Sequence, residues 1–575
     1  MNSALEILEL ELKSILTKAL TNLKLAKPEI LEFSTPPPNL GDYAFPCFEL
    51  AKEKPERIAE MLSKESLKYK SKFIDKVEAV GAYVNFFINY DKLKELVIKS
   101  ALELKERYGW QAPKHDKIIL EHTSANPTGP IHVGRARNSI IGDTLARVLR
   151  ANGYEVETQY YVNDMGKQVG ILVWGLDNIK LEKTEPKAMP KSDHELVKYY
   201  QEASKLLEAM PQLESEIDKL LQLYEGNDIK TKAKVRSCCE KVLHGNIETL
   251  AKLNIKLDKY VWESDFIGTT REVLSNFRSS KLCREEEGAY YLDLSSGKLF
   301  ITRKDSTTLY ATRDLAYHLY KFKNCTHAIN VLGEDHKLEA LQLEEALKVL
   351  GCSNKPEVIF YSFVSLPEGR LSTRKGRVVY TDDLIEEAIA RAYLEVKERR
   401  KKFDKHEFKK ISEADLKKIA AIIGIGAIRY NIIRVQNEKP IIFKWEEAIS
   451  FEGNSAPFVQ YSHARACSIL SKSKGYYKNK IELSLLKERQ ELELVKILAR
   501  FPKVIKDVGS SRKVYKLANY VFELATQFNQ FYRDVPVLKA EPKELRDARL
   551  ALVDATRIVL RNALELLGIE APEEM

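Results

Sequence analysis

The clearest pattern of hydrophobic and polar positions lies between residues 117 and 162. Residues 117–120 (K-I-I-L) read as a short buried strand, and apolar side chains then recur at helical spacing from Ile140 to Leu149. Residues 156–162 alternate in the manner of a second strand. The pattern therefore predicts a strand–helix–strand unit, with a loop between its first strand and its helix.

That loop opens the segment T-S-A-N-P-T-G-P-I-H-V-G-R-A-R-N-S-I-I-G-D, residues 123–143, which is rich in glycine, proline and small polar residues. A loop of this kind places ligand groups at a helix N-terminus, where free N–H groups and the helix dipole favour phosphate. His132 falls at the predicted helix start, and Gly134 leaves room for close approach. The segment has neither the G-K-[ST] of a P-loop nor the G-x-G-x-x-G of a dinucleotide site.

The same patterns divide the rest of the chain. Apolar positions predict an amphipathic helix over 4–25 and strands over 77–89, so residues up to about 112 form a separate α+β unit. The helical, highly charged stretch at about 176–256 predicts an insertion on the surface of the core. After Asp383 nearly every segment is helical. Four strand-like segments precede it, which we expect to form a second half of the same parallel sheet: 290–294, 299–302, 328–332 and 357–365.

Composition narrows the class of protein. Of the 575 residues, 44% are hydrophobic and 30% charged, as in ordinary soluble globular proteins. The chain has no apolar run of membrane-spanning length and no basic leader, so we expect no membrane association and a cytoplasmic location. The net charge of +9 is better explained by solvated lysine and glutamate faces, yet it permits a polyanionic partner. The seven cysteines form no C-x-x-C pair, so neither structural zinc nor a disulfide framework is expected.

A second candidate loop follows the apolar segment 358–364. Residues 369–377, G-R-L-S-T-R-K-G-R, combine two glycines, two hydroxyls and four cations. Arginine offers phosphate bidentate contacts, and lysine offers a point charge. Alone, such a loop is more often ordinary basic surface. In one parallel sheet, however, it would lie at the same edge as the His132 loop, and together the two predict a triphosphate site.

These residues resemble a known family. His132-Val133-Gly134-Arg135 resembles the HIGH signature of class I aminoacyl-tRNA synthetases, and residues 370–375 (R-L-S-T-R-K) resemble their KMSKS loop. Further segments are similar to arginyl-tRNA synthetases in particular: S-A-N-P-T-G-P-I-H-V-G (124–134), Y-Y-V-N-D (160–164), Y-A-T-R-D (310–314), S-F-E-G-N (450–454), G-D-Y-A (41–44) and the C-terminal stretch from 547 to 575. The resemblance therefore covers essentially the whole chain.

The resemblance implies an α/β multidomain fold, with a Rossmann-type parallel-sheet catalytic core, an N-terminal α+β domain and a C-terminal all-α helical-bundle domain. We place a tRNA-contacting domain at 1–112, the catalytic domain at 113–383 with its insertion at about 176–256, a helical connector at 384–445 and an anticodon-binding domain at 446–575. Members of the family are expected to be monomers.

The resemblance also implies a ligase reaction in two steps. The carboxylate of L-arginine attacks the α-phosphate of ATP to give arginyl-adenylate, and a terminal ribose hydroxyl of tRNA(Arg) then attacks the acyl carbon. Because no covalent enzyme intermediate forms, catalysis rests on positioning and charge stabilisation. Mg²⁺ enters with ATP and needs no dedicated protein cage.

Roles for ATP carry over residue by residue. His132 would contact the α-phosphate, with Gly134 and Arg135 beside it, and Arg374 and Lys375 would complete the catalytic set. The leaving pyrophosphate would be held by four residues: Ser372, Thr373, Arg374 and Lys375. Arg135 departs from the family pattern, which usually has a second histidine there. It lies three residues after His132 and can face the same site, but the ATP atom it contacts is open.

The resemblance assigns the binding of arginine to Glu121, Ser124, Asn126, Glu263, Tyr310, Asp314 and His336. Ser124 and Asn126 would bind the amino and carboxylate end, with His336 near the amino group. Tyr310 and Asp314 are four residues apart, so they can share a helix face and, with Glu263, surround a guanidinium. Taken singly, each is better explained as an ordinary surface charge or core tyrosine.

Candidates for contact with tRNA are Asn39 and Tyr43 in the N-terminal domain, and Phe458, Gln460 and Tyr461 in the helical domain. For Phe458 a core role is equally consistent with the sequence.

Two other functions of the chain also stay open. One is another class I synthetase, although the chain lacks the zinc cysteines of cysteinyl types and the large editing insertion of leucyl types. The other is a tRNA-binding paralogue without catalysis, against which the intact signature residues count.

Overall fold

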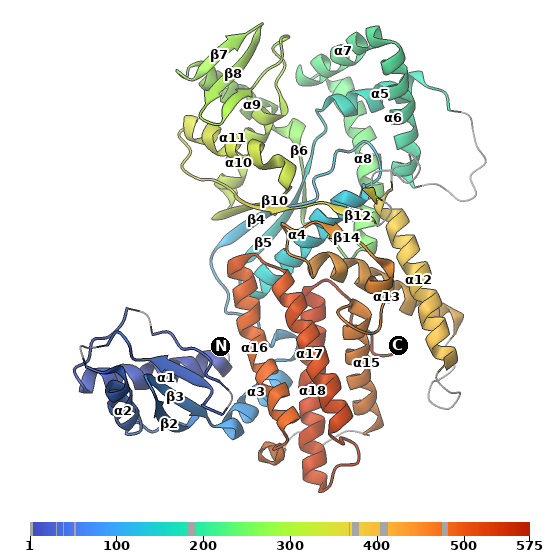
Figure 1. Cartoon of the computed structure of the whole chain (residues 1–575). Helices are drawn as coiled ribbons and strands as arrows, with labels where there is room; N and C mark the ends of the chain where they lie inside the picture. Colours follow the sequence, from blue (N-terminus) through green and yellow to red (C-terminus); the bar gives the residue numbers. More distant parts are fainter. Residues whose placement is uncertain are drawn as a thin grey trace.

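The computed structural model describes residues 4–29, 31–37, 39–50, 53–181, 191–366, 369–370, 379–402, 412–473 and 481–575. Figure 1 shows a small N-terminal unit beside a helical bundle, and a sheet-based core from which two further lobes project. The predicted fold class, a parallel-sheet core between an α+β unit and an all-α bundle, is confirmed. Within the described residues no helix is long and apolar enough to cross a membrane.

The N-terminal unit is an antiparallel sheet of order β1–β3–β2 with two helices. Its elements are α1 (Ala4–Asn22), β1 (Tyr43–Pro46), α2 (Pro55–Ser66), β2 (Ile74–Val80) and β3 (Tyr83–Ile88). The apolar stripe of α1, which includes Leu8, Leu12 and Leu16, is fully buried. Helix α3 (Tyr90–Leu104) then packs on the C-terminal bundle, where buried Lys94 donates to the carbonyl of Leu486 at 2.7 Å.

Five parallel strands form the core sheet in the order β11–β10–β4–β5–β6. They are β4 (Lys117–Glu121), β5 (Glu155–Val162), β6 (Lys259–Trp262), β10 (His327–Gly333) and β11 (Glu357–Tyr361). The chain leaves β4 through helix α4 (Val133–Ala151) toward β5, and it returns later to β10 on the other side of β4. Ligands of open α/β sheets bind at this kind of switch point, outside the carboxyl ends of the strands.

Two of the four segments expected in this sheet lie elsewhere. Segments 290–294 and 299–302 contribute instead to a separate antiparallel sheet of β7 (Cys283–Glu286), β8 (Ala289–Leu294) and β9 (Gly297–Phe300). The expectation was wrong because only Ser295 and Ser296 separate β8 from β9. Two residues allow a hairpin, whereas a parallel crossover needs a dozen or more. The pattern also missed β6, which forms one edge of the core sheet.

The insertion between β5 and β6 consists of α5 (Lys167–Asn178), α6 (Ser192–Ala209), α7 (Glu214–Glu225) and α8 (Ile229–Lys252). The helices beside the second half of the sheet are α9 (Ile267–Arg278), α10 (Tyr310–Asn324) and α11 (Lys337–Val349). The remaining helices are α12 (Thr381–Lys402), α13 (Glu413–Ile433), α14 (Trp445–Ala448), α15 (Ala456–Lys472), α16 (Arg489–Ser511), α17 (Tyr515–Asp534) and α18 (Lys543–Leu566). A third small sheet joins β12 (Val364–Leu366), β13 (Gly369–Arg370) and β14 (Ile441–Ile442), and short 3-10 turns include η3 (Glu263–Phe266) and η4 (Glu334–His336).

A single buried guanidinium ties the core to the bundle. Arg429 of α13 donates to the carbonyls of Leu567 (2.8 Å) and Leu253 (2.7 Å) and to the carboxylate of Asp143 on α4 (2.6 Å). Burial raises the pKa of Asp143, but Arg429 and Arg147 more than offset it, so the carboxyl titrates below its ordinary range. Arg429 thereby fixes α4, and with it the His132 loop, against the helical domain.

Candidate active site

The loop after β4 begins in strained backbone held by the first turns of α4. Thr123 and Ser124 have φ values of 73° and 36°, in the left-handed region that non-glycine residues rarely adopt. The amide of Thr123 donates to Oδ1 of Asn138 (2.5 Å), and its hydroxyl donates to Ser139 (2.9 Å). Asn138 in turn donates to the carbonyl of Val331 on β10 (2.7 Å). These hydrogen bonds hold the loop in place beside β4 and β10, the two strands on either side of the switch point.

His132 is the N-cap of α4. Its Nδ1 accepts a hydrogen bond from the amide of Gly134 at 3.1 Å, which leaves the ring N–H on Nε2. Burial, and then the charge of Arg135, lower the pKa of His132, so the ring is neutral at pH 7. The site thus holds a neutral N–H donor at a helix N-terminus, where the helix dipole favours phosphate oxygens. Arg135 is exposed on the first turn of the same helix.

The backbone around His132 pairs with the segment that leads into α12. His132 and Tyr380 form an antiparallel bridge, the amide of Val133 donates to the carbonyl of Val379 (3.2 Å), and the amide of Thr381 donates to Ile131 (2.8 Å). The chain that follows the second candidate loop therefore lies directly beside the first. Four residues predicted in that second loop lie outside the described residues: Ser372, Thr373, Arg374 and Lys375.

A buried polar network crosses the carboxyl ends of β4 and β10, where Glu121 and Asn330 are register partners. The hydroxyl of Ser124 donates to Oε1 of Glu121 (2.9 Å). Lys321 of α10, which is fully buried, donates to Oε2 of Glu121 and to Oδ1 of Asn330, both at 2.8 Å. Two residues predicted to bind arginine, Glu121 and Ser124, are therefore brought together.

The network continues to Asp314 through His318. The amide nitrogen of Asn330 faces Nε2 of His318 at 2.8 Å and donates to it, so the proton of the ring lies on Nδ1. Nδ1 donates to the carbonyl of Asp314 (2.9 Å), and the Asp314 carboxylate lies at 3.3 Å. Burial raises the pKa of Asp314, but His318 and Lys321 more than offset it, so the carboxylate stays ionised.

Tyr310 and Asp314 line a cavity of about 260 Å³, together with Glu339 and apolar side chains. The hydroxyl of Tyr310 has a pKa well above its ordinary value, raised first by Asp314, then by burial, and then by Glu121, Glu339 and Glu263. Since the Tyr310 side chain is 42% exposed, we assign most of this shift to the charges. Four carboxylates thus act on one ring at the mouth of the cavity, which is where a cation is favoured.

Three other residues predicted to bind arginine have protein partners. Glu263 is wholly buried, and its Oε1 accepts from Nε of Arg313 at 2.8 Å. Its other oxygen, Oε2, is buried without a hydrogen-bond partner among the described residues, so contact of Glu263 with a substrate guanidinium stays a prediction. Asn126 donates to Gln168 (2.9 Å). His336 lies in η4, where its Nε2 is 3.8 Å from the carboxylate of Asp335, and its place near the amino group of arginine stays a prediction.

The predicted tRNA contacts differ in accessibility. Gln460 is fully buried, and its amide donates to the carbonyls of Ile422 (3.3 Å) and Glu570 (2.9 Å), so it braces α13 and the C-terminal tail. Its assignment as an RNA contact is corrected for this reason. Phe458 is half-buried against Phe522, with ring centroids 5.5 Å apart, and Tyr461 is half-buried with a guanidinium 4.7 Å above its ring.

Asn39 and Tyr43 line a groove of about 2080 Å³ between the N-terminal unit and helices α16 and α17. Burial, followed by the charges of Glu9 and Asp42, raises the pKa of Tyr43 to about 12. Lysines and arginines from α16 line the opposite side of the groove, including Arg489, Lys496, Arg500 and Lys503. The groove is therefore wide and carries charges of both signs, because Arg500 pairs with Glu523 (2.7 Å) and Lys503 pairs with Glu9 (3.1 Å).

Sequence reasoning missed the residues that hold the site together. His318 and Lys321 continue the helical spacing of the predicted Tyr310 and Asp314 on α10, so the shared face was a signal that could have extended the prediction to them. Arg137, five residues after His132, had no such signal. It is fully buried and donates to the carbonyls of Ser362 (2.7 Å), Gln436 (2.9 Å) and Lys439 (2.9 Å), which fixes α4 against the chain after β11.

Comparison with known proteins places this geometry in a family. The model described as "tRNA synthetases class I (R), catalytic domain" matches residues 97–445. The "Arginyl tRNA synthetase N terminal domain" matches residues 10–88, and the "DALR anticodon binding domain" matches residues 459–575. The chain belongs to the arginyl-tRNA synthetase family.

Curated and solved members of the family cover nearly the whole chain. The arginine–tRNA ligase of Methanocella arvoryzae is 48% identical over 543 residues, 92% of each chain. That of Methanocaldococcus jannaschii is 43% identical over 560 residues, 94% of this chain and 95% of the other. The solved arginyl-tRNA synthetase of Thermus thermophilus superposes with a TM-score of 0.79 at 27% identity, covering 98% of this chain and 99% of the other. As a member of the arginyl-tRNA synthetase family, the chain is a class I ligase.

Proposed function

We propose that the chain activates L-arginine with ATP and transfers it to the 3′ end of tRNA(Arg). The observation that carries this proposal is the buried network from Ser124 to Asp314, which joins the edge of the His132 loop to a cavity lined by the carboxylates of Asp314 and Glu339, by Tyr310 and by apolar side chains. A cation-selective cavity connected to a phosphate-binding helix start suits an amino acid with a guanidinium side chain and a carboxylate that attacks ATP. Membership of the arginyl-tRNA synthetase family supports the same substrates.

In this proposal the side chain of arginine enters the cavity beside Asp314. The ionised carboxylate accepts from the guanidinium, and the accessible ring of Tyr310 stacks on its planar face. Lysine, a point charge without a planar face, would form weaker contacts in the same place. Glu263 pairs with Arg313 through Oε1 and keeps Oε2 without a hydrogen-bond partner in the described part of the chain, so this oxygen can accept from the guanidinium.

The amino and carboxylate end of arginine then lies toward Glu121, Ser124 and Asn126. Glu121 is held in place by the hydrogen bond from Lys321, and its oxygens can accept from an ammonium group. Asn126 can exchange its bond to Gln168 for one to the substrate carboxylate. Because the two ends are fixed by one network, the carboxylate is presented to ATP in a defined position.

ATP occupies the edge of the sheet at the start of α4. The Nε2–H of His132 donates to the α-phosphate as negative charge develops there, and the dipole of α4 adds to this stabilisation. Arg135 supplies a further donor from the first helical turn. By resemblance, Ser372, Thr373, Arg374 and Lys375 hold the pyrophosphate, and Mg²⁺ arrives bound to ATP.

The tRNA extends from the active site across the helical bundle. We assign contacts to Asn39 and Tyr43 in the wide groove and to Phe458 and Tyr461 on α15. We divide the chain into a tRNA-contacting domain (1–112), a catalytic domain (113–383), a connector (384–445) and an anticodon-binding domain (446–575). We further propose that the protein acts as a monomer in the cytoplasm.

Charging of total tRNA with labelled arginine tests the function. The expected result is acid-stable, base-labile incorporation of arginine into tRNA that requires both ATP and enzyme. Binding of tRNA without any incorporation would contradict the proposal and favour a tRNA-binding paralogue. An Asp314→Asn variant provides the control that any incorporation comes from this site.

A further inference from the structure

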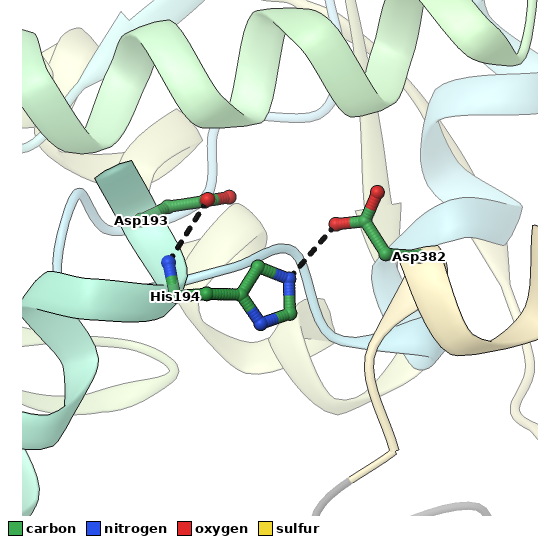
Figure 2. Close-up of side chains that lie close together, drawn as sticks. All are labelled: Asp193, His194 and Asp382. Atoms are coloured by element: carbon green, nitrogen blue, oxygen red, sulfur yellow. Dashed lines mark hydrogen bonds and ion pairs between the residues drawn. The ribbon is translucent and has the colours of Figure 1, made fainter. Parts of the chain in front are cut away.

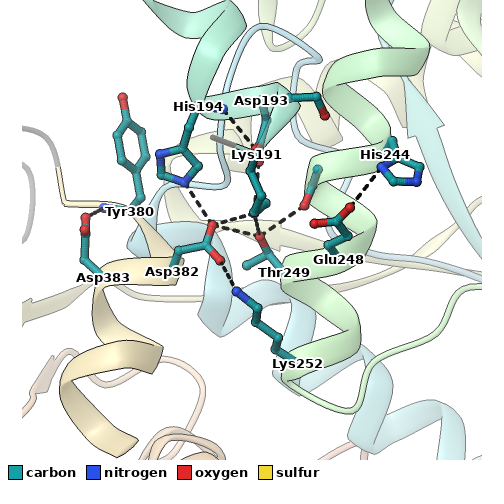
Figure 3. Close-up of polar contacts among 12 residues, drawn as sticks. Lys191, Asp193, His194, His244, Glu248, Thr249, Lys252, Tyr380, Asp382 and Asp383 are labelled. Carbon is teal, nitrogen blue, oxygen red and sulfur yellow. Dashed lines mark hydrogen bonds and ion pairs between the residues drawn. The ribbon is translucent and has the colours of Figure 1, made fainter. Parts of the chain in front are cut away.

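A compact cluster of charges joins the helical insertion to the start of α12. The carboxylate of Asp382 accepts from Nζ of Lys191 (2.6 Å), Oγ1 of Thr249 (3.0 Å), Nε2 of His194 (3.1 Å) and Nζ of Lys252 (3.3 Å). Figure 3 shows these donors converging from α6, α8 and the residue before α6 on the first turn of α12. Asp382 is only 5% exposed, so four donors enclose a nearly buried carboxylate.

The negative charge of Asp382 is already neutralised by cationic side chains of the protein itself. Asp193, His194 and Asp382 place ligand atoms within 4.8 Å of one another, the trio seen in Figure 2. Two ammonium groups, however, lie within 3.3 Å of Asp382, and a divalent cation would be repelled by them. Burial raises the pKa of Asp382, but His194 and Lys191 hold it well below its ordinary range. The carboxylate is therefore permanently charged and bound by the chain's own donors.

The cluster lies one residue from the segment that pairs with the His132 loop. Thr381, next to Asp382, donates to the carbonyl of Ile131, and Tyr380 bridges His132 itself. The ring of Tyr380 also meets the ring of His194 edge-on, with centroids 5.3 Å apart. Tyr380 and Thr381 immediately precede Asp382 in the chain. A displacement of Asp382 would therefore also move the backbone that pairs with His132 and its neighbours.

We infer that Asp382 is a positioning residue for the ATP site, held by Lys191, Thr249, His194 and Lys252 of the insertion, and that it fixes the backbone of His132. The insertion then has a function in the reaction, since it anchors the start of α12 against the sheet edge. This inference rests on the proposed role of His132 toward ATP. A displacement of a reacting group by about 1 Å can lower a rate by about 100-fold, so a distant anchor has a measurable effect.

The test is Asp382→Asn in the full-length chain, with steady-state charging measured at varied ATP and at varied arginine. Loss of the charge should release the lysines and lower kcat/KM for ATP by about 10- to 100-fold, with little change in the KM for arginine. Lys191→Met should reproduce much of this loss, because the Lys191 side chain is only 17% exposed and its Nζ lies 2.6 Å from the Asp382 carboxylate. Lys252→Met should have a smaller effect, because Lys252 is 47% exposed and lies at 3.3 Å.

Two controls make the result decisive. Glu491→Gln breaks the buried pair with Arg549 (2.7 Å) in the helical bundle and should lower thermal stability without altering the kinetics for ATP. His132→Asn keeps an N-cap residue but removes the ring donor. If His132→Asn leaves the kinetics for ATP unchanged, the proposed role of His132 fails. If it impairs them while Asp382→Asn and Lys191→Met do not, or if those variants affect ATP and arginine equally, the inference alone is overturned.

Discussion

The replacement Asp314→Asn tests the cation cavity with almost no change in shape. The Asp314 side chain is 18% exposed, and its carboxylate is the largest contributor to the raised pKa of Tyr310. The substitution removes one negative charge and one acceptor for a guanidinium. It leaves the main-chain carbonyl of Asp314, which accepts from His318 at 2.9 Å, so the histidine should stay in place.

The size of the effect follows from the hydrogen bonds that are lost. A hydrogen bond to a charged, partly buried group is worth about 1.5–3 kcal/mol. Because each 1.4 kcal/mol corresponds to a tenfold change, the Kd for arginine should rise about 10- to 150-fold. The KM for ATP should change little, since Asp314 lies at the far end of the network from His132.

The assay is steady-state charging with arginine and ATP varied separately, supported by equilibrium binding of arginine. Glu339→Gln is the matched control, because Glu339 lines the same cavity but is exposed, where a single charge contributes at most about 1 kcal/mol. Equal increases in both KM values, or an effect no larger than that of Glu339→Gln, would refute the assignment of the cavity.

Three further outcomes are expected. Lys321→Met removes the cationic partner of the buried Glu121, so the free energy of unfolding in urea should fall by about 3–5 kcal/mol. An unchanged midpoint of urea unfolding would show that this ion pair does not stabilise the fold. Gln460→Ala removes two part-buried hydrogen bonds and should cost about 1–3 kcal/mol in the same assay, while the Kd for tRNA stays near the wild-type value. Burial lowers the pKa of His122 and of His463 to about 4, below the value of about 6.5 in the unfolded chain. The unfolded state therefore binds more protons, and stability should decline as pH falls from about 6.5 toward 4; a flat profile over this window would contradict burial of the two rings.

Local patterns allowed much of the core to be predicted. The strand–loop–helix unit around His132 is contiguous in sequence, and its apolar spacing carries a strong signal. The position of His132 at the helix start follows from the same pattern. By contrast, the strands around Tyr290 and Leu299 show alternation without revealing their partners, and only the short turn between them excludes the core sheet.

The partners of the site residues could not be predicted, because they depend on long-range packing. Glu263 meets Arg313 across 50 positions, and Lys321 meets Glu121 across 200. Gln460 has an amide side chain that could hydrogen-bond to a base of RNA, but it faces inward and donates to the C-terminal tail of the protein. The type of a polar side chain determines which groups it can hydrogen-bond to. The tertiary fold determines whether its partner is a ligand or another part of the protein.

The most direct test of the account compares charging of total tRNA with each of the standard amino acids under identical conditions. The predicted result is ATP-dependent charging with arginine and a strong preference for arginine over lysine, since lysine lacks the planar group that Tyr310 and Asp314 are proposed to hold. Comparable charging with lysine, or preferential charging with any other amino acid, would contradict the account.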